Sequence, residues 1–169
     1  MKKLIFVTGA SSGIGKALSI KFANSGWKVL ASARRLDILK KLDKESIKSD
    51  AIIPIKMDIV NKKTVSSQVN KTITKYGIPD IVLLNAGTNN PNSKNIFSLE
   101  ETEQIFKINF FGTLNCLHAL LTFLKKKNNS QVIFMSSVAG YRGLPYAAAY
   151  CSSKSAITTF AESIYNQCK

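Results

Sequence analysis

Residues 4–15 read LIFVTGASSGIG, and this stretch decides how the chain folds. Its first four residues, Leu4 to Val7, are apolar and predict a short buried strand. Glycines follow at positions 9, 13 and 15, and apolar residues then recur at helical spacing until Gly26. A glycine-rich turn of this kind lets the backbone approach a pyrophosphate at the helix N-terminus. An ordinary strand-to-helix turn is the alternative, but the strand before the glycines and the helix after them favour a nucleotide site.

The rest of the chain repeats this alternation of apolar runs and amphipathic segments. The apolar runs predict four more strands, at Lys28 to Ala33, Ala51 to Met57, Ile81 to Leu84 and Gln131 to Ser137. The amphipathic segments predict helices over Leu36 to Glu45, Lys62 to Tyr76, Leu99 to Lys126 with a bend near Gly112, and Ala148 to Cys168. The polar stretch from Thr88 to Asn95 predicts a surface loop.

This order of elements predicts the fold class. Strands that alternate with helices form βαβ units, whose right-handed crossovers place helices on both faces of a parallel sheet. We therefore expect an α/β protein with a doubly wound parallel sheet of the Rossmann type, in which five strands are present. Residues 1–169 contain neither an internal repeat nor a linker, so we expect one nucleotide-binding domain.

The composition is that of a globular protein, since 45% of the 169 residues are hydrophobic and 20% are charged. The apolar run near the N-terminus is too short for a signal peptide, and no stretch approaches the ~20 apolar residues of a membrane helix. We therefore expect a soluble cytoplasmic protein with no membrane partner. The three cysteines, Cys116, Cys151 and Cys168, lack metal-site spacing, so we expect free thiols and no metal.

The formal net charge of +14 makes nucleic-acid binding an alternative to consider. Lysines supply 21 of the 24 basic residues and are scattered over predicted helices and loops, with the densest cluster at Lys125 to Lys127. No known nucleic-acid-binding motif accompanies them. We therefore interpret them as a solvated surface that would attract anionic ligands, and we expect no nucleic-acid partner.

The end of the second predicted strand indicates which dinucleotide would bind. Sites for NAD place an acidic residue there, on the ribose 2′-hydroxyl. Ala33 stands at that position, and Arg34 and Arg35 follow it. Guanidinium groups bind phosphate through two hydrogen bonds, which suits the 2′-phosphate of NADP. Two solvated arginines at a helix start are the alternative, but the missing acid and the added bases together favour NADP(H) over NAD.

The spacing Thr-Gly-x-x-x-Gly-Ile-Gly resembles the short-chain dehydrogenase/reductase (SDR) family, and the resemblance extends from Leu4 to about Lys169. In that family an Asp after the third strand contacts the adenine, as Asp58 would here, and an N-cap or turn role is compatible with this. Asn85-Ala86-Gly87 matches the family's Asn-Ala-Gly element, whose Gly lies close to the cofactor ribose. With the arginines, the resemblance implies cofactor contacts at Gly9, Ser11, Ser12, Gly13, Ile14, Gly15, Arg34, Arg35, Asp58, Ile59, Asn85, Ala86, Gly87, Tyr150 and Lys154.

Ser137, Tyr150 and Lys154 resemble the family's Ser-Tyr-Lys set in their spacing behind the fifth predicted strand. Tyr150 and Lys154 lie four residues apart and so share one face of a helix. A phenol ordinarily ionises at about pH 10, and a nearby ammonium group lowers that value. The resemblance implies that Tyr150 is the acid in carbonyl reduction and the base in alcohol oxidation, while Lys154 tunes it and holds the ribose hydroxyls. Ser137 would bond the substrate oxygen.

Asn109 matches the family's fourth catalytic position, where it would anchor a water that links Lys154 to solvent. A kink-forming or satisfied core asparagine is the alternative. The stretches from Thr88 to Ile96 and from Tyr141 to Tyr146 would line the substrate side. We expect Tyr141, Tyr146 and Tyr165, which do not fit the catalytic spacing, to be packing residues.

Family members continue after the last predicted helix with a sixth strand, a substrate-covering loop, another helix and a seventh strand. The resemblance therefore implies a chain shortened at its C-terminus, with an unpaired sheet edge. Two functions follow as alternatives. One is an NADP-dependent oxidoreductase acting on a small carbonyl or alcohol substrate, and the other is a non-catalytic nucleotide-binding remnant. The resemblance also implies a homodimer or homotetramer through residues 110–126 and 148–168.

Overall fold

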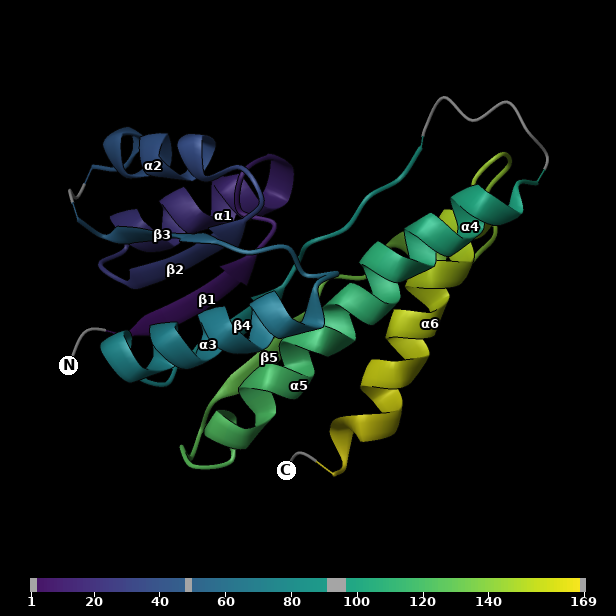
Figure 1. The fold of residues 1–169 in the computed structure, drawn as a ribbon. Coiled ribbons are helices and arrows are strands. Elements are labelled where there is room, and N and C mark those ends of the chain that lie inside the picture. The colour runs from purple at the N-terminus through teal and green to yellow at the C-terminus, as the bar shows by residue number, and fades with distance from the viewer. Residues whose placement is uncertain (1–2, 48–49, 91–96, 168–169) are drawn as a thin grey trace.

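The computed structural model describes residues 3–47, 50–90 and 97–167 and shows the expected doubly wound α/β fold (Figure 1). Five parallel strands lie in the order β3-β2-β1-β4-β5. Their bounds are β1 (Leu4–Thr8), β2 (Lys28–Ala33), β3 (Ile52–Lys56), β4 (Ile81–Leu84) and β5 (Gln131–Phe134). The strand order reverses between β1 and β4, and this fold binds ligands in the crevice at that reversal, beyond the carboxyl ends of the strands.

Helices cover both faces of the sheet. Helices α1 (Gly13–Asn24) and α2 (Leu36–Glu45) pack on one face, and α3 (Lys62–Tyr76) and α5 (Thr113–Leu124) on the other. Helix α6 (Ala148–Tyr165) packs against α4 (Leu99–Phe106) and runs beside the α4–α5 segment in Figure 1. The loops that follow β1, β4 and β5 therefore meet at one edge of the sheet.

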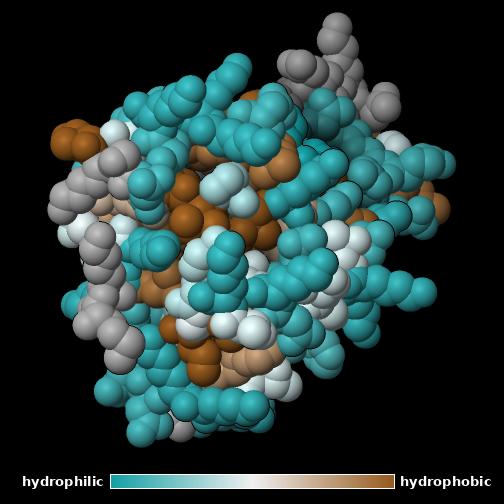
Figure 2. All heavy atoms as spheres, turned by 60° about the vertical axis from the view of Figure 1, so that its left-hand side comes forward, coloured by the Kyte–Doolittle hydropathy of each residue, from teal (hydrophilic) through white to brown (hydrophobic). Residues whose placement is uncertain are grey.

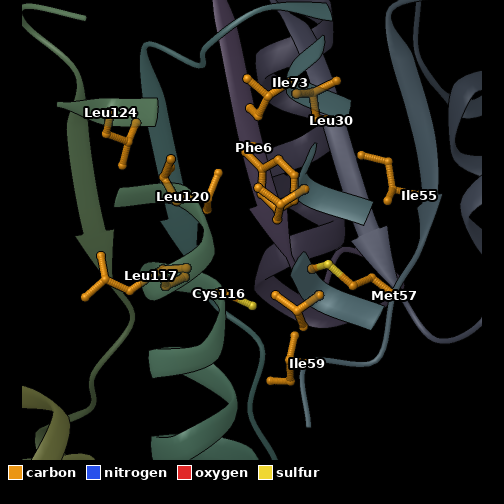
Figure 3. Packing of buried hydrophobic residues seen from close by; sticks show 14 of the residues in the cluster. Phe6, Leu30, Ile55, Met57, Ile59, Ile73, Cys116, Leu117, Leu120 and Leu124 are labelled. Atoms are coloured by element: carbon orange, nitrogen blue, oxygen red, sulfur yellow. The ribbon is translucent and has the colours of Figure 1, made fainter. Parts of the chain in front are cut away.

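The alternation of side chains along β1 supplies both cores. Phe6 faces α3 and α5, where it packs among the residues drawn in Figure 3, including Leu30, Ile73 and Leu120. Ile5 and its neighbours on the other face pack against α1 and α2. All five residues of β1 are buried, so the strand that leads into the glycine turn is fixed from both sides.

The cysteines that the structure describes are free thiols. Cys116 lies in the core of Figure 3, and burial raises the pKa of its thiol to about 12, which marks a structural rather than a reactive side chain. Cys151 is also buried and free. The third predicted thiol, Cys168, lies outside the described residues.

The long helix predicted over Leu99 to Lys126 is interrupted. Between α4 and α5 the chain forms one π-helical segment, η1 (Lys107–Gly112), which ends at the glycine where the bend was expected. A side chain at Gly112 would collide with Ile59, since an added Cβ would lie 2.7 Å from Ile59 Cδ1. Glycine at the point where the helix changes its winding thus lets it lie close to the loop after β3 without displacing the Ile59 side chain.

Two strands and the last helix end at other residues than predicted. β3 is one residue shorter at each end than expected, and β5 ends at Phe134 because the chain leaves the sheet towards the 3₁₀ turn η2 (Val138–Gly140). Helix α6 ends at Tyr165.

Asp58 does not cap a helix. Its Oδ1 accepts a hydrogen bond from the Val60 amide at 3.1 Å in a turn, and Asn61 caps α3.

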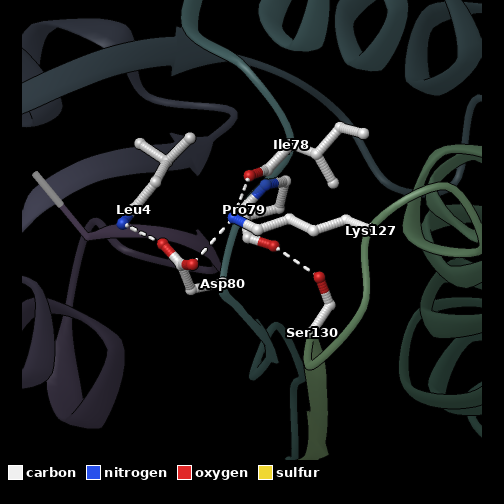
Figure 4. A network of polar contacts seen from close by, with 6 residues as sticks. All are labelled: Leu4, Ile78, Pro79, Asp80, Lys127 and Ser130. Carbon is white, nitrogen blue, oxygen red and sulfur yellow. Dashed lines mark hydrogen bonds and ion pairs between the residues drawn. The ribbon is translucent and has the colours of Figure 1, made fainter. Parts of the chain in front are cut away.

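A polar network joins the amino end of β1 to the turn before β5 (Figure 4). Asp80 accepts hydrogen bonds from the Leu4 amide at 2.7 Å and from Lys127 Nζ at 2.7 Å. Lys127 also donates to the Ile78 carbonyl oxygen at 2.9 Å. Partial burial by itself raises the pKa of the Asp80 carboxyl, but the hydrogen bonds from Lys127 and Leu4 and the Lys127 charge outweigh it, so the pKa lies below its ordinary value.

Hydrophilic side chains cover most of the face shown in Figure 2, and apolar atoms lie mainly in recesses between them. Tyr141, Tyr146 and Tyr165 are 79%, 70% and 63% exposed, so the expectation that they are packing residues was wrong. In the part of the chain that the structure describes, no helix is both long and apolar enough to span a bilayer.

Candidate active site

One cavity of about 630 Å³ opens at the carboxyl edge of the sheet. Residues predicted to bind the cofactor and residues predicted to be catalytic both line it. The glycine-rich turn after β1 and the end of β2 contribute one part of its wall, and β5 and α6 contribute another. Of the predicted site residues, the following line it: Gly9, Ser11, Ser12, Gly13, Ile14, Arg34, Arg35, Asp58, Ile59, Asn85, Ala86, Gly87, Ser137, Tyr150 and Lys154. Gly15 and Asn109 do not.

The turn after β1 is shaped by close backbone approach. Gly9 has φ +69°, and an added Cβ would lie 2.7 Å from Ala86 Cα. A Cβ on Gly15 would collide with the carbonyl oxygen of Gly9. Gly13, by contrast, faces open space. Gly15 therefore packs the start of α1 onto the turn, and Gly13 leaves room beside the helix N-terminus for a ligand.

The start of α1 is suited to an anion. Ser12 occupies the N-cap position but makes no side-chain capping hydrogen bond, and the first turn contains no acidic residue. Free amide groups and the positive end of the helix dipole favour a phosphate at such a position. These residues therefore fit the pyrophosphate of a dinucleotide.

Thr8 holds the ends of β1 and β4 together. Its Oγ1 accepts hydrogen bonds from the Asn85 and Ala86 amides, each at 3.0 Å, and Asn85 Nδ2 donates to the Thr8 carbonyl oxygen at 3.0 Å. Asn85 therefore supports the strand ends with its side chain while it borders the cavity. Thr8 was quoted within the glycine motif but was not among the predicted site residues.

The arginines lie where β2 passes into α2. Ala33 is buried, Arg34 and Arg35 are exposed at the cavity wall, and Arg35 Nη2 donates to Ser11 Oγ at 3.1 Å. This contact brings one guanidinium group beside the glycine turn. Two cations and no carboxylate at the end of β2 fit a phosphate on the ribose.

Lys154 is buried beside Tyr150. Its Nζ lies 5.7 Å from the centroid of the Tyr150 ring and donates to the Met135 carbonyl oxygen at 2.8 Å. A Cβ on Gly87 would lie 3.5 Å from this Nζ, an ordinary contact distance, so the ammonium lies close beside the segment that follows β4. Burial lowers the pKa of Lys154 from its ordinary value. The arrangement places a partly desolvated cation next to a phenol.

Two serines follow β5, and only the second was predicted. Ser137 Oγ accepts a hydrogen bond from the Ala139 amide at 3.2 Å, and the residue lines the cavity with Tyr150. Ser136 also lines the cavity, and its Oγ lies 2.6 Å from Thr158 Oγ1 and donates to the Lys154 carbonyl oxygen at 3.2 Å. Ser136 thus ties the end of β5 to α6. Sequence alone does not distinguish a serine that lines the cavity from one that also bridges two elements.

Asn109 lies behind the cavity and is 1% exposed. Its Oδ1 accepts from the Thr88 amide at 2.7 Å, and its Nδ2 donates to the Thr88 carbonyl oxygen at 2.9 Å and to Ser153 Oγ at 3.0 Å. The side chain therefore joins η1, the segment after β4, and α6.

Thr88 and Asn89 of the stretch expected on the substrate side also line the cavity. The remaining wall comes from residues that were not predicted as site residues: Ser32, Ala33, Met57, Val60, Ile108, Met135 and Ser136. A smaller hollow beside Tyr150 contains Asn89 and Tyr146, from the two stretches expected on the substrate side. Residues 91–96 of the first stretch lie outside the described residues.

A glycine-rich turn and a Tyr-Lys pair line one cavity of a doubly wound sheet, and this arrangement is typical of dinucleotide-binding α/β proteins. A family model described as short chain dehydrogenase matches residues 3–169. The chain belongs to the short-chain dehydrogenase family.

Relatives and solved structures agree with this membership. The chain is 35% identical over 175 residues to a dehydrogenase/reductase SDR family protein 7-like of Dictyostelium discoideum, and the match covers 99% of this chain and 55% of that protein. It is 30% identical over 164 residues to an NADPH-dependent pterin aldehyde reductase of Arabidopsis thaliana, covering 96% of this chain and 67% of that protein. The chain thus spans about half to two thirds of the length of these curated relatives.

Among solved structures, the chain is similar to an alcohol dehydrogenase from the archaeon Thermococcus sibiricus complexed with 5-hydroxy-NADP. The identity is 26% and the TM-score 0.89, over 99% of this chain and 72% of that chain.

Proposed function

We propose that this chain binds NADP(H) and catalyses the reduction of a carbonyl compound or the oxidation of the corresponding alcohol. The observation that carries the proposal is the shared cavity, in which Tyr150 and Lys154 face the same space as the glycine turn. A family member that bound a dinucleotide without chemistry would use the turn and Lys154 for binding, but it would not need a phenol that exchanges a proton beside this ammonium. The printed names of two relatives, a reductase that depends on NADPH and an alcohol dehydrogenase complexed with an NADP derivative, support the same cofactor and the same pair of functional groups.

Binding of the cofactor would rest on three groups of residues. The turn from Gly9 to Gly15 and the start of α1 would hold the pyrophosphate. Arg34 and Arg35 would hold the 2′-phosphate. Asp58 and Ile59 would border the adenine, and the segment from Asn85 to Gly87 together with Lys154 would border the ribose next to the nicotinamide.

The bound cofactor would supply the hydride. In reduction, the Tyr150 hydroxyl would donate its proton to the carbonyl oxygen as negative charge develops there, and in oxidation the phenolate would take that proton back. The Lys154 ammonium would stabilise the phenolate form. Ser137 would donate a hydrogen bond to the same oxygen.

Assays of NADPH and NADH oxidation with a panel of aldehydes and ketones test this proposal. We expect turnover with NADPH, and slower turnover or none with NADH. A folded sample that binds NADPH but reduces no member of the panel, and oxidises no alcohol with NADP⁺, would instead support the non-catalytic nucleotide-binding alternative.

Assembly through α5 and α6 into a homodimer or homotetramer stays a prediction. Phe111, on the segment between α4 and α5, is 57% exposed, and an aromatic side chain of this kind is common in protein interfaces. Size-exclusion chromatography with light scattering tests it directly.

A further inference from the structure

Ser153 stands next to Lys154 in the sequence, but it does not line the cavity. Its side chain is completely buried, with 0% exposure. The hydroxyl donates to the Tyr150 carbonyl oxygen at 2.8 Å and accepts from Asn109 Nδ2 at 3.0 Å. Both the donor and an acceptor site of this hydroxyl are therefore used, and one of its partners is the backbone of the proposed acid-base residue.

The hydrogen bonds continue from Ser153 through Asn109 to the segment after β4. The Asn109 amide group binds Thr88 through both its oxygen and its nitrogen, at 2.7 and 2.9 Å. Thr88 directly follows Gly87, over which Lys154 Nζ lies. The network therefore joins the backbone of Tyr150 to the strand end that borders the proposed ribose position.

The start of α6 lacks a side-chain cap, and Ser136 and Met135 bond it only through Lys154, one turn further along the helix than Tyr150. Ala147 is the N-cap residue and provides no side-chain capping hydrogen bond, and the residues from Tyr141 to Tyr146 before it are exposed. Tyr150 lies in the first turn of this helix. A helix start without a side-chain cap relies on other contacts to fix its place. The buried hydrogen bond from Asn109 to Ser153 is such a contact in the first turns of α6, and Ser153 in turn bonds the Tyr150 carbonyl oxygen.

We propose that Ser153 is a positioning residue, which sets the place of Tyr150 relative to the cofactor cradle by linking α6 to Asn109 and Thr88. The inference rests on the proposed function for its kinetic consequence, but not for its structural one. Buried networks in which every group is satisfied hold one arrangement, and removal of one member leaves a donor of Asn109 without its acceptor.

Ser153→Ala is the test, and Ser152→Ala is its matched control because Ser152 is the exposed neighbour on the same helix. In the Ser153→Ala variant we expect kcat per NADPH-binding site to fall about tenfold or more, since small misplacements of reacting groups are costly. The Kd for NADPH should change less than about twofold, and the pH dependence of kcat should shift. Ser152→Ala should match the native chain in all three.

A purely structural serine would behave differently. Lower thermal stability with unchanged kcat and an unchanged pH profile in Ser153→Ala would overturn the proposal. If Ser153→Ala does not fold, Ser153→Thr decides, because threonine in a helix keeps a hydroxyl that can bond the carbonyl three or four residues earlier. We expect this variant to keep a kcat within about threefold of the native value when it folds, and a loss as large as that from a Tyr150→Phe change would contradict the proposal.

A second readout separates this proposal from the proposed function. With ¹³C-labelled tyrosine, the Tyr150 ring resonance of the NADP⁺-bound chain should move in Ser153→Ala and stay in place in Ser152→Ala. If the native chain binds NADP⁺ but turns over no substrate, the proposed function fails and this resonance alone decides the positioning role. An unmoved resonance in Ser153→Ala would overturn it.

Discussion

Arg34 and Arg35 are exposed at the cavity wall where β2 ends, and the acidic residue typical of NAD sites is replaced there by buried Ala33. We expect the double change Arg34→Ala and Arg35→Ala to raise the Kd for NADPH about tenfold or more, because hydrogen bonds to a charged phosphate are lost. The Kd for NADH, which lacks this phosphate, should change little.

Fluorescence titration with both dinucleotides measures this difference. The control is Lys126→Ala, which removes a positive charge at an exposed position outside the cavity wall. An equal loss of affinity for NADPH and NADH in the arginine variant would show that these residues do not read the 2′-phosphate.

Lys154 gives a prediction that depends on pH. Burial lowers its pKa in the folded chain, so between that lowered value and its unfolded value of about 10.4 the unfolded chain binds more protons than the folded one. The free energy of unfolding contributed by this residue therefore rises with pH across that window. Lys154→Met removes the titration. Urea unfolding at a series of alkaline pH values should show the native chain gaining stability relative to Lys154→Met as the pH rises, and a constant difference would contradict the account.

At the scale of elements, the Asp80 network fastens β1 to the α5–β5 connection. We expect Asp80→Asn to lower the free energy of unfolding at neutral pH by about 1 kcal/mol, since the pair is partly exposed and solvent screens it. The depressed pKa means that this stability is present above the ordinary carboxyl value of about 3.9 and is lost as pH falls through the lowered folded value.

Denaturant unfolding of the native chain, Asp80→Asn and the exposed control Glu103→Gln measures the effect. The gap between the native chain and Asp80→Asn should close in acid, and the control should lie close to the native chain at neutral pH. A gap that persists in acid, or no gap at neutral pH, would mean that the carboxylate does not hold these elements together.

Element bounds were predictable where local chemistry sets them. Helix α3 begins and ends as expected, because Asn61 accepts the Thr64 amide at one end and Gly77 adopts φ +93° at the other. The π-helical segment and the early end of β5 were not predictable. They depend on contacts between distant parts of the chain, such as that of Gly112 with Ile59.

The site residues likewise divide into those that a local sequence pattern marks and those that no local pattern marks. Glycine spacing and the four-residue interval between Tyr150 and Lys154 are local patterns, so sequence alone indicated them. Thr8 and Ser153 act through hydroxyl bonds to residues 77 and 44 positions away, and no local pattern marks such partners. Thr8 and Ser153 were thus missed because their roles exist only in the folded chain.

At the scale of the whole molecule, the fold places the glycine turn and the Tyr150–Lys154 pair in one cavity at the crevice beside β1 and β4. The family membership covers residues 3–169, and the chain spans part of the length of its relatives. That residues 1–169 form one domain stays a prediction. The central claim is that this chain's own Tyr150 exchanges the proton during hydride transfer.

A single-turnover experiment tests that claim most directly. The native chain and Tyr150→Phe, each saturated with NADPH, are mixed with a carbonyl substrate found by the panel, and the loss of NADPH absorbance is followed. The account predicts NADPH affinities that differ far less between the two proteins than their rates do, with a rate in Tyr150→Phe lower by about a hundredfold or more. Equal rates in the two proteins, or no turnover by a native chain that binds NADPH, would contradict it.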